Sequence, residues 1–261
     1  MMKTFIRAAI LAYAFDGVTQ LAAFQVAAPF DNADQGAYSD GWQNADNGGS
    51  GFDAWTLTTT GTDASHFAGF FIGSSTDAGG NNDTNSKSFG IFANPTGASA
   101  DAVRTLSSDL AVGKQFTLDM VVNFRNGNKG FDLRDSSGAT LFNLNVGSDA
   151  YTVNNAVSGN GPLFGNTYDA NTVFSLAFEQ TSLTGGSWTV TRSGGQTGSA
   201  TGSYNGLVRG FKLYVQDTDA GGAPQNNLYA NNFAVVPEPS AVALLLAGSL
   251  AGGCWLVRRR A

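Results

Sequence analysis

The side chains able to do chemistry in this chain are carboxylates and amides, because it has a single histidine, His66, and a single cysteine, Cys254. A histidine-based triad needs the imidazole beside a nucleophile. His66 instead opens an apolar stretch, where we expect a structural or surface role. One histidine and no cysteine before residue 254 also disfavour a zinc site, which usually takes several such ligands.

Oxygen-rich loops point to calcium instead. Asp217, Asp219, Asn226 and Asn227 cluster between two predicted late strands, and hard oxygen ligands suit Ca²⁺. A second loop rich in Asp and Asn covers residues 77–85. Neither loop has the spacing of an EF-hand. Such turns are also typical of any β protein, because these side chains bond to nearby backbone, so calcium binding and ordinary turns remain alternatives.

Aromatic residues beside glycine-containing stretches suggest sugar binding. Trp42 and Trp55 flank the stretch 47–51, and Trp188 follows two glycines. Their rings could lie against the flat face of a sugar. The alternative is packing, because a β-sandwich needs large rings to fill its interior. We name Trp42, Trp55 and Trp188 as possible sugar-binding residues, and extracellular polysaccharide as a possible partner.

Carboxylates are the remaining candidates for catalysis. Glycoside hydrolysis normally uses two of them, one on each side of the bond. Glu179 is the only glutamate between residues 29 and 236, so an enzyme would have to recruit aspartates. At the end of a predicted strand, Glu179 is more typical of a solvated side chain. We therefore expect the body not to be an enzyme, and assign no catalytic residue.

Strands must position these side chains. Glycine and asparagine are abundant and helix-type stretches are absent, which favours strands joined by turns. Turn signals at 135–138 and 193–195 predict antiparallel connections, and Asn126-Gly127-Asn128 predicts a hairpin. The pattern predicts an all-β, two-sheet antiparallel β-sandwich of jelly-roll-like type. The predicted strands cover residues 55–59, 66–72, 88–92, 116–124, 130–134, 140–146, 173–180, 187–192, 198–204, 210–216 and 228–235.

The charge of this body argues against nucleic acid as a partner. Residues 29–236 contain 17 Asp and one Glu against five Arg and four Lys, a net charge of −9. No basic stripe is available to neutralise phosphates. Without cysteine the body has no disulfide, so its stability must come from its core, and about 200 residues suffice for one domain.

The C-terminal segment has the features of a membrane anchor. Residues 241–257 form an apolar run that stops at Arg258, Arg259 and Arg260. As a helix this run would be roughly 26 Å long, slightly short of a hydrocarbon core of about 30 Å. Arginines at this end favour the cytoplasmic side, so we expect the N-terminal body outside the cytoplasm.

Pro237-Glu238-Pro239-Ser240 comes directly before this run. Together, the motif, the apolar helix and the arginine cluster resemble the PEP-CTERM sorting signal. The resemblance implies export in a Gram-negative bacterium, transient anchoring in the inner membrane, and cleavage near the motif by an exosortase, which passes the body to the cell surface. An ordinary single-span anchor is the alternative.

The N-terminus predicts the matching export signal, with Lys3 and Arg7 before an apolar stretch and small residues near the expected cleavage site. The predicted segments are a signal peptide (1–28), a β-sandwich body (29–236) and the sorting signal (237–261). In strand number and size the body is similar to concanavalin A-like and other lectin-type sandwiches, a likeness of architecture that carries over no binding residue.

These features predict an exported surface or extracellular-matrix protein whose body is adhesive, structural or carbohydrate-binding. One alternative is a polysaccharide-active enzyme, a glycoside hydrolase or lyase, on a lectin-like sandwich. Another is a passive coat component without a ligand. A rigid pair of carboxylates in a groove would favour the enzyme, whereas exposed aromatic rings without such a pair would favour the binding protein.

Overall fold

The computed structural model describes residues 28–147, 150–166 and 168–237 of the chain. The predicted signal peptide, apart from its last residue, and the predicted sorting segment beyond Pro237 lie outside these residues. Within the described ranges, no helix has both the length and the hydropathy needed to cross a membrane.

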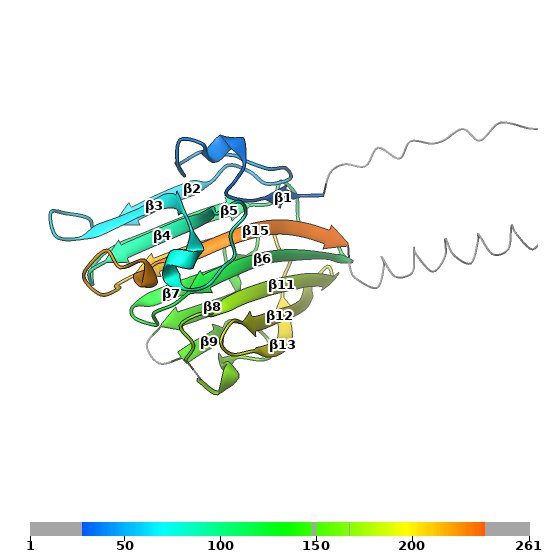
Figure 1. Cartoon of the computed structure of the whole chain (residues 1–261). Coiled ribbons are helices and arrows are strands. Elements are labelled where there is room, and N and C mark those ends of the chain that lie inside the picture. The colour runs from blue at the N-terminus through cyan, green and yellow to red at the C-terminus, as the bar shows by residue number, and fades with distance from the viewer. Residues whose placement is uncertain (1–27, 148–149, 167, 238–261) are drawn as a thin grey trace, which may run out of the picture.

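The body is an antiparallel β-sandwich, as the sequence predicts (Figure 1). One sheet has eight strands in the order β13-β12-β11-β6-β15-β4-β3, with β1 paired to β15. Its strands are β1 (Phe30–Asp31), β3 (Phe67–Gly73), β4 (Ser88–Asn94), β6 (Lys114–Val122), β11 (Val173–Ser182), β12 (Gly185–Ser193), β13 (Gly198–Asn205) and β15 (Leu228–Pro237).

The second sheet has seven strands in the order β10-β9-β8-β7-β14-β5-β2. Its strands are β2 (Thr56–Thr60), β5 (Ser99–Thr105), β7 (Asn128–Arg134), β8 (Thr140–Gly147), β9 (Ala150–Asn154), β10 (Gly161–Pro162) and β14 (Gly210–Gln216). The helical elements described are the short 3₁₀ turns η1 (Gly36–Tyr38), η2 (Ser75–Ala78), η3 (Phe164–Asn166) and η4 (Pro224–Asn226).

Alternation along each strand separates the core from the outer faces. In β6, Phe116, Leu118 and Met120 are buried in the core, while Thr117 and Asp119 lie on the outer face. Facing rings from the two sheets fill the space between them: Phe131 stacks on Phe178 with 5.2 Å between ring centroids. The sandwich therefore has one continuous aromatic core and two outer faces, one for each sheet.

The connections predicted at 135–138 and 193–195 are confirmed, because β7 pairs with β8 and β12 pairs with β13. The hairpin predicted at Asn126-Gly127-Asn128 is wrong. This segment carries the chain from β6 in one sheet to β7 in the other, and the two strands do not pair. The same turn residues serve either connection, and turn chemistry alone does not tell which strand becomes the neighbour.

The loop at residues 74–87 crosses the outer face of the eight-stranded sheet and appears in cyan in front of the strands in Figure 1. Ala78 packs there on Val121 and Tyr229, in a small cluster separate from the main core. Asn82 donates to the backbone oxygen of Asp119 at 3.0 Å. The loop thereby divides this outer face into a part over β3 and β4 and a part over β6, β11 and β12.

Both ends of the described body lie at the same end of the sandwich. The backbone nitrogen of Val235 donates to the Pro29 oxygen at 2.8 Å, and Phe30 pairs with Ala234. β15 ends there at Pro237, one residue beyond the predicted body, and starts at Leu228 at the opposite end. We call the opposite end, where the 217–227 loop precedes β15, the distal end (Figure 1).

Candidate functional site

The three tryptophans predicted as sugar-binding residues are buried, so that prediction is wrong. Trp42, Trp55 and Trp188 are only 4%, 1% and 1% exposed. Trp55 donates from Nε1 to the Tyr38 hydroxyl, and Trp188 donates from Nε1 to the Ser158 backbone oxygen, both at 3.1 Å. Burial leaves little of these rings free to lie against a sugar, and Trp42 only borders a depression of about 500 Å³ beside Phe70 and Lys87. The packing alternative explains them, because this aromatic core needs large rings.

The residues predicted to bind calcium do not converge on one point. Asp217 accepts from the Gly97 nitrogen through Oδ1 at 2.7 Å, and the backbone oxygen of Asp219 accepts from Asn226 Nδ2 at 3.4 Å. Asn227 donates to the Tyr229 hydroxyl at 3.4 Å. Among the described residues, no group of three or more His, Cys, Asp or Glu is placed to hold a metal ion.

A buried ammonium lies at this loop. Lys129 is 0% exposed, and its Nζ donates to Asn126 Oδ1 at 2.8 Å and to the Asn226 backbone oxygen at 3.2 Å. Burial lowers the pKa of Lys129 to about 7, although the nearby Asp219 carboxylate opposes that shift. The amine of Lys129 thus occupies the space beside these oxygens and bonds to them. Calcium binding stays a prediction, which an unchanged melting temperature in EDTA would contradict.

His66 and Glu179 remain outside any described catalytic arrangement. The Nδ1 atom of His66 lies 2.7 Å from Asp63 Oδ1, a local contact three residues apart in an exposed turn. Glu179 lies on the outer face of β11, opposite Gln115 and Ser187. Pro237 is the one member of the predicted sorting motif within the described residues, and it is exposed.

A hollow lies at the distal end, between β3, β4 and the 217–227 loop. Its volume is about 470 Å³, within the usual range for ligand pockets. We call it the distal hollow. It is lined by Phe67, Phe71, Phe92, Asn94, Gly221, Gly222 and Asn227. Three aromatic rings and two side-chain amides therefore face one space, and Phe67 is 54% exposed.

Strand pairing brings these rings to one face. Phe67, Gly69 and Phe71 of β3 pair with Asn94, Phe92 and Gly90 of β4. Each pairing that includes Phe71 or Phe92 places a glycine opposite the ring. A Cβ on Gly90 would lie 2.3 Å from the Phe71 ring, and one on Gly69 would lie 3.0 Å from Phe92. The glycines let the rings lie close over the neighbouring strand, which builds the aromatic wall of the hollow.

The 217–227 loop forms the other wall and is anchored at several points. Thr218 donates twice to the Ala93 backbone oxygen, from its nitrogen at 3.1 Å and from Oγ1 at 2.6 Å. Lys129 holds the Asn226 oxygen on the far side of the loop. These contacts fix the position of Asn227, so that its amide lines the hollow.

A second depression, which we call the Asp119 groove, lies on the same outer face beyond the 74–87 loop. It has a volume of about 160 Å³. Ser175 donates to Asp119 Oδ1 at 2.7 Å, and Asn232 donates to Oδ2 at 3.1 Å. Asn232 has φ of 58° within an irregularity of β15. The Asp119 groove is lined by Thr117, Leu118, Asp119, Ser175, Leu176, Ala177, Thr189, Thr191 and Asn232.

The outer face of the other sheet carries a charged network. The ammonium of Lys212 lies 3.4 Å from Asp132 Oδ2 and 3.8 Å from Asp101 Oδ2. Asn143 donates to both Asp132 and the Tyr214 hydroxyl. Burial raises the pKa of Tyr214, and the two nearby carboxylates act in the same direction, so its hydroxyl is protonated at neutral pH.

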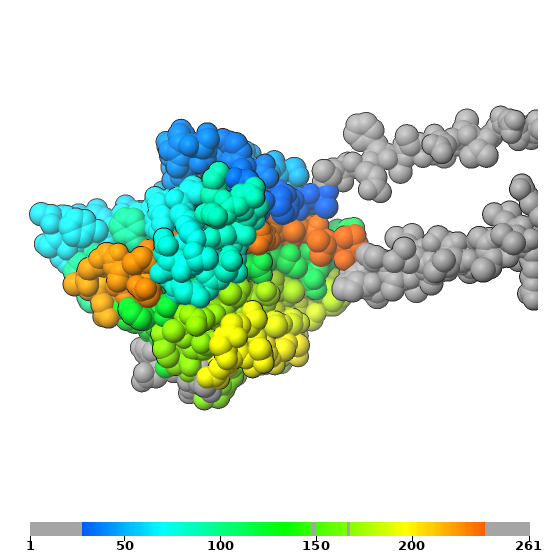
Figure 2. Space-filling model, in the orientation of Figure 1, coloured from blue at the N-terminus to red at the C-terminus, as the bar shows by residue number. Residues whose placement is uncertain are grey.

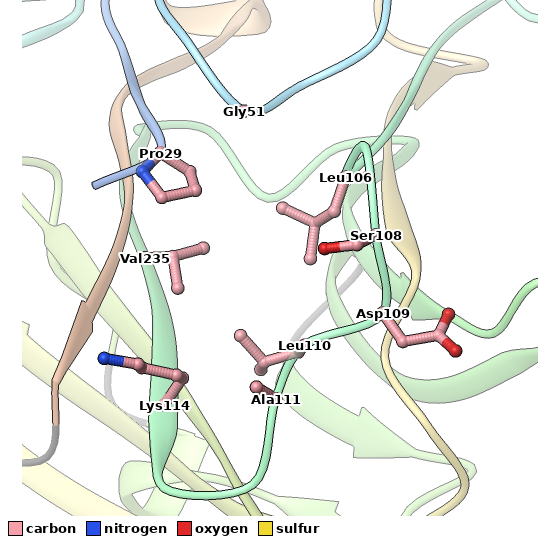
Figure 3. Close-up of a pocket in the computed structure, with 9 residues that line it drawn as sticks. All are labelled: Pro29, Gly51, Leu106, Ser108, Asp109, Leu110, Ala111, Lys114 and Val235. Atoms are coloured by element: carbon pink, nitrogen blue, oxygen red, sulfur yellow. The ribbon is translucent and has the colours of Figure 1, made fainter. Parts of the chain in front are cut away.

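A small hollow of about 110 Å³ lies at the opposite end, near the two ends of the described body (Figure 3). Pro29 and Val235 face Leu106 and Leu110 across it, with the Lys114 side chain at its edge. It is smaller than ordinary ligand pockets and largely aliphatic. The distal hollow is therefore the better candidate site.

No protein family matches the chain, and no curated protein does. Solved structures resemble it in fold alone. A sialidase is similar over 81% of this chain and 19% of its own, with 10% identity and a TM-score of 0.46. The PL-14 alginate lyase from Aplysia kurodai is similar over 69% of this chain and 90% of its own, with 14% identity and a TM-score of 0.36. The carbohydrate recognition domain of Emp47p is similar over 79% of this chain and 95% of its own, with 11% identity and a TM-score of 0.30.

The expectation that the body is not an enzyme is corrected by this comparison. Sandwiches of similar fold are named sialidase and alginate lyase as well as carbohydrate recognition domain.

Proposed function

We propose that the body is a polysaccharide-active protein that holds a glycan chain in the distal hollow. The observation that carries this proposal is an aromatic wall of exposed Phe67 with half-buried Phe71 and Phe92, in a hollow also lined by Asn94 and Asn227. Apolar ring faces suit the C–H face of a sugar, and amides suit its hydroxyl groups. Exposed rings at a hollow of this kind mark an interaction site.

Phe67→Ala tests this proposal, because Phe67 is half exposed and lies outside the main core. Burying an aromatic ring contributes about 1.5–3 kcal/mol, so we expect retention of the full-length protein on insoluble polysaccharides to fall about 10-fold or more. Phe30→Ala is the matched control, since Phe30 is 41% exposed at the other end of the body. Equal retention of wild type and Phe67→Ala would contradict the proposal.

The second candidate function is cleavage of a glycan chain on the outer face of the seven-stranded sheet, and one observation favours it. Asp101 and Asp132 both lie within 4 Å of the Lys212 ammonium, and two neighbouring carboxylates are what glycoside hydrolysis requires. The same experiment tests for cleavage if released sugar is assayed. Release by wild type but not by Asp132→Asn would show that the protein cleaves the polysaccharide.

We also propose export and exosortase processing, on the residues of the tail. Pro237-Glu238-Pro239-Ser240, the apolar run and the three arginines support it. Because both ends of the described body lie opposite the distal hollow, a body anchored through its tail would present the hollow away from the membrane.

Cell fractionation checks this second proposal. Replacing Glu238 and Pro239 by alanine removes the motif while keeping the apolar run, and we expect the full-length form to accumulate in the inner membrane. Glu179→Gln is the control for loss of one acidic residue. Release of the motif variant at the wild-type rate would contradict processing at this motif.

A further inference from the structure

The outer face of the eight-stranded sheet carries carboxylates but no cations at its strand positions. Among the described strands of this sheet the basic residues are Lys114 and Arg192. Arg192 is buried, in alternation with the core residue Val190, and Lys114 alternates with Phe116 at the end of β6. Asp119 and Glu179 occupy outward positions. A ligand lying along these strands therefore meets negative charge.

Hydroxyl groups surround Asp119 on this face. Ser175 lies opposite Asp119, and the neighbouring strand adds Thr189 and Thr191. An ionised carboxylate offers about four acceptor positions, and the side-chain donors described here, Ser175 and Asn232, use two of them. Asp119 thus keeps acceptor capacity inside a groove whose other polar groups can bond to sugar hydroxyls.

The irregularity in β15 fixes this arrangement. Between Asn231 and Ala234 the register with β6 shifts, and Asn232 adopts a positive φ. Thr84 donates to Asn232 Oδ1 at 2.9 Å, which leaves the Nδ2 group to donate to Asp119. Irregularities of this type re-aim side chains beside functional sites. Asp119 is therefore held in place before any ligand arrives.

We propose that the Asp119 groove is a second glycan subsite that binds the ammonium group of an amino sugar. The polysaccharide bound by this protein is then a polymer that carries amino groups, and not a polyuronate. The distal hollow also accepts the neutral sugar units of that polymer. This inference rests on the proposed function. A volume of about 160 Å³ suits the amino group and neighbouring hydroxyls of one sugar unit.

Electrostatics disfavours a polyanionic ligand along these strands. The cation on the adjoining 74–87 loop, Lys87, is paired with Asp34. A polyuronate would bring a row of carboxylates to a face that offers Asp119 and Glu179 and no cation at the strand positions described above. The net charge of −9 on residues 29–236 repels such a chain at longer range as well. An ammonium instead gains a charge-assisted hydrogen bond to Asp119, the stronger type of hydrogen bond.

The test compares three polymers: chitosan in mildly acidic buffer, where its amino groups are protonated, neutral chitin and the polyuronate alginate. Retention of the full-length protein, purified in mild detergent, is measured with EDTA present so that calcium cannot bridge carboxylates. Asp119→Asn removes the charge and keeps the shape. Glu179→Gln removes the same charge from the same face, four residues along β11 from Ser175 and so roughly 13 Å away.

We expect chitosan to be retained most strongly, and Asp119→Asn to weaken that retention about 10-fold while retention on chitin and the melting temperature stay unchanged. Glu179→Gln should have little effect. Retention on alginate equal to that on chitosan, or equal weakening by both variants, would overturn this inference and leave the proposed function standing. Failure to retain any of the three polymers would contradict the proposed function itself.

Discussion

Of the buried basic side chains described in this acidic body, Arg104 and Lys129 each fix a segment that lacks regular structure. Arg104 forms a fully buried ion pair with Asp31 and lies over the Phe52 and Trp55 rings, with its Cζ atom 4.9 Å from each centroid. It ties the segment before β2 to the sandwich. Lys129 does the same for the 217–227 loop. Arginine keeps its charge when buried, whereas lysine can lose its proton.

Lys129 gives folding a particular pH dependence. Its pKa falls from the ordinary 10.5 to about 7 in the folded protein, because burial disfavours the charged form. Between these values the unfolded chain binds the proton and the folded protein does not, so the Lys129 contribution to the free energy of unfolding rises with pH. Relative to Lys129→Met, the free energy of unfolding of wild type should rise by up to about 1.4 kcal/mol per pH unit between about pH 7 and 9.

Urea denaturation of both proteins at several pH values measures this difference. Lys212→Met is the control, since Lys212 lies on an outer face and is partly exposed. A difference between wild type and Lys129→Met that does not change with pH would show that Lys129 keeps its proton in the folded protein.

The 74–87 loop shows how one carboxylate orders an element. Asp83 accepts from Ser74 Oγ at 2.6 Å, from the Ser75 nitrogen and Oγ at 2.8 and 2.6 Å, and from Ser88 Oγ at 2.8 Å. Burial raises the pKa of Asp83, but these hydrogen bonds together outweigh burial and hold the pKa below its ordinary value. The loop that divides the outer face is therefore fixed by an ionised group.

Asp83→Ala should destabilise the protein by about 1–3 kcal/mol, because it leaves several donors without their acceptor. The Asp83 contribution is complete above the ordinary pKa of 3.8 and is lost as the pH falls through the lower folded value. Wild type and Asp83→Ala should therefore converge in stability in acid. Chemical denaturation at neutral and acidic pH, with the surface variant Asp109→Asn as control, measures this. A constant gap down to the lowest pH would contradict it.

Sequence patterns predicted most strands, and the missed ones have a physical reason. In β5 the inward positions are filled by Ala100, Ala102 and Arg104. Alanine has a low β-propensity, and an inward arginine breaks the apolar alternation, so the pattern does not read as a strand. The short β9 has only Tyr151 and Val153 facing the core.

The site was harder to predict than the fold. In β3, Phe67 and Phe71 alternate with Ala68, Phe70 and Ile72, so both faces read as apolar and the exposed rings cannot be told from core residues. Tryptophan is the stronger sequence signal for sugar binding, but the large tryptophan rings of this protein are packed in its core. The small residues opposite the rings, such as Gly90, were the missed clue, because a partner strand cannot be assigned from one sequence.

At the scale of the whole molecule, the candidate ligand site and the two ends of the described body lie at opposite ends of the sandwich. β15 runs from the distal hollow to the end where both ends of the described body meet, so one strand connects the candidate ligand site with the point from which the tail leaves (Figure 2). Figure 2 shows β3 in cyan beside the 217–227 loop in orange, on the side away from the two ends of the described body. This arrangement suits a surface protein that holds a polymer away from the membrane.

Hydrogen exchange of the full-length protein with and without a soluble chitosan oligosaccharide tests the central claim most directly, because it locates the ligand without altering a residue. We predict slower exchange in the 217–227 loop, in β3 and β4, and in β6 beside Asp119, with the small hollow between Pro29 and Leu106 unchanged. Protection confined to β7, β8 and β14, or no protection at a concentration that saturates retention, would contradict a glycan site on the eight-stranded sheet.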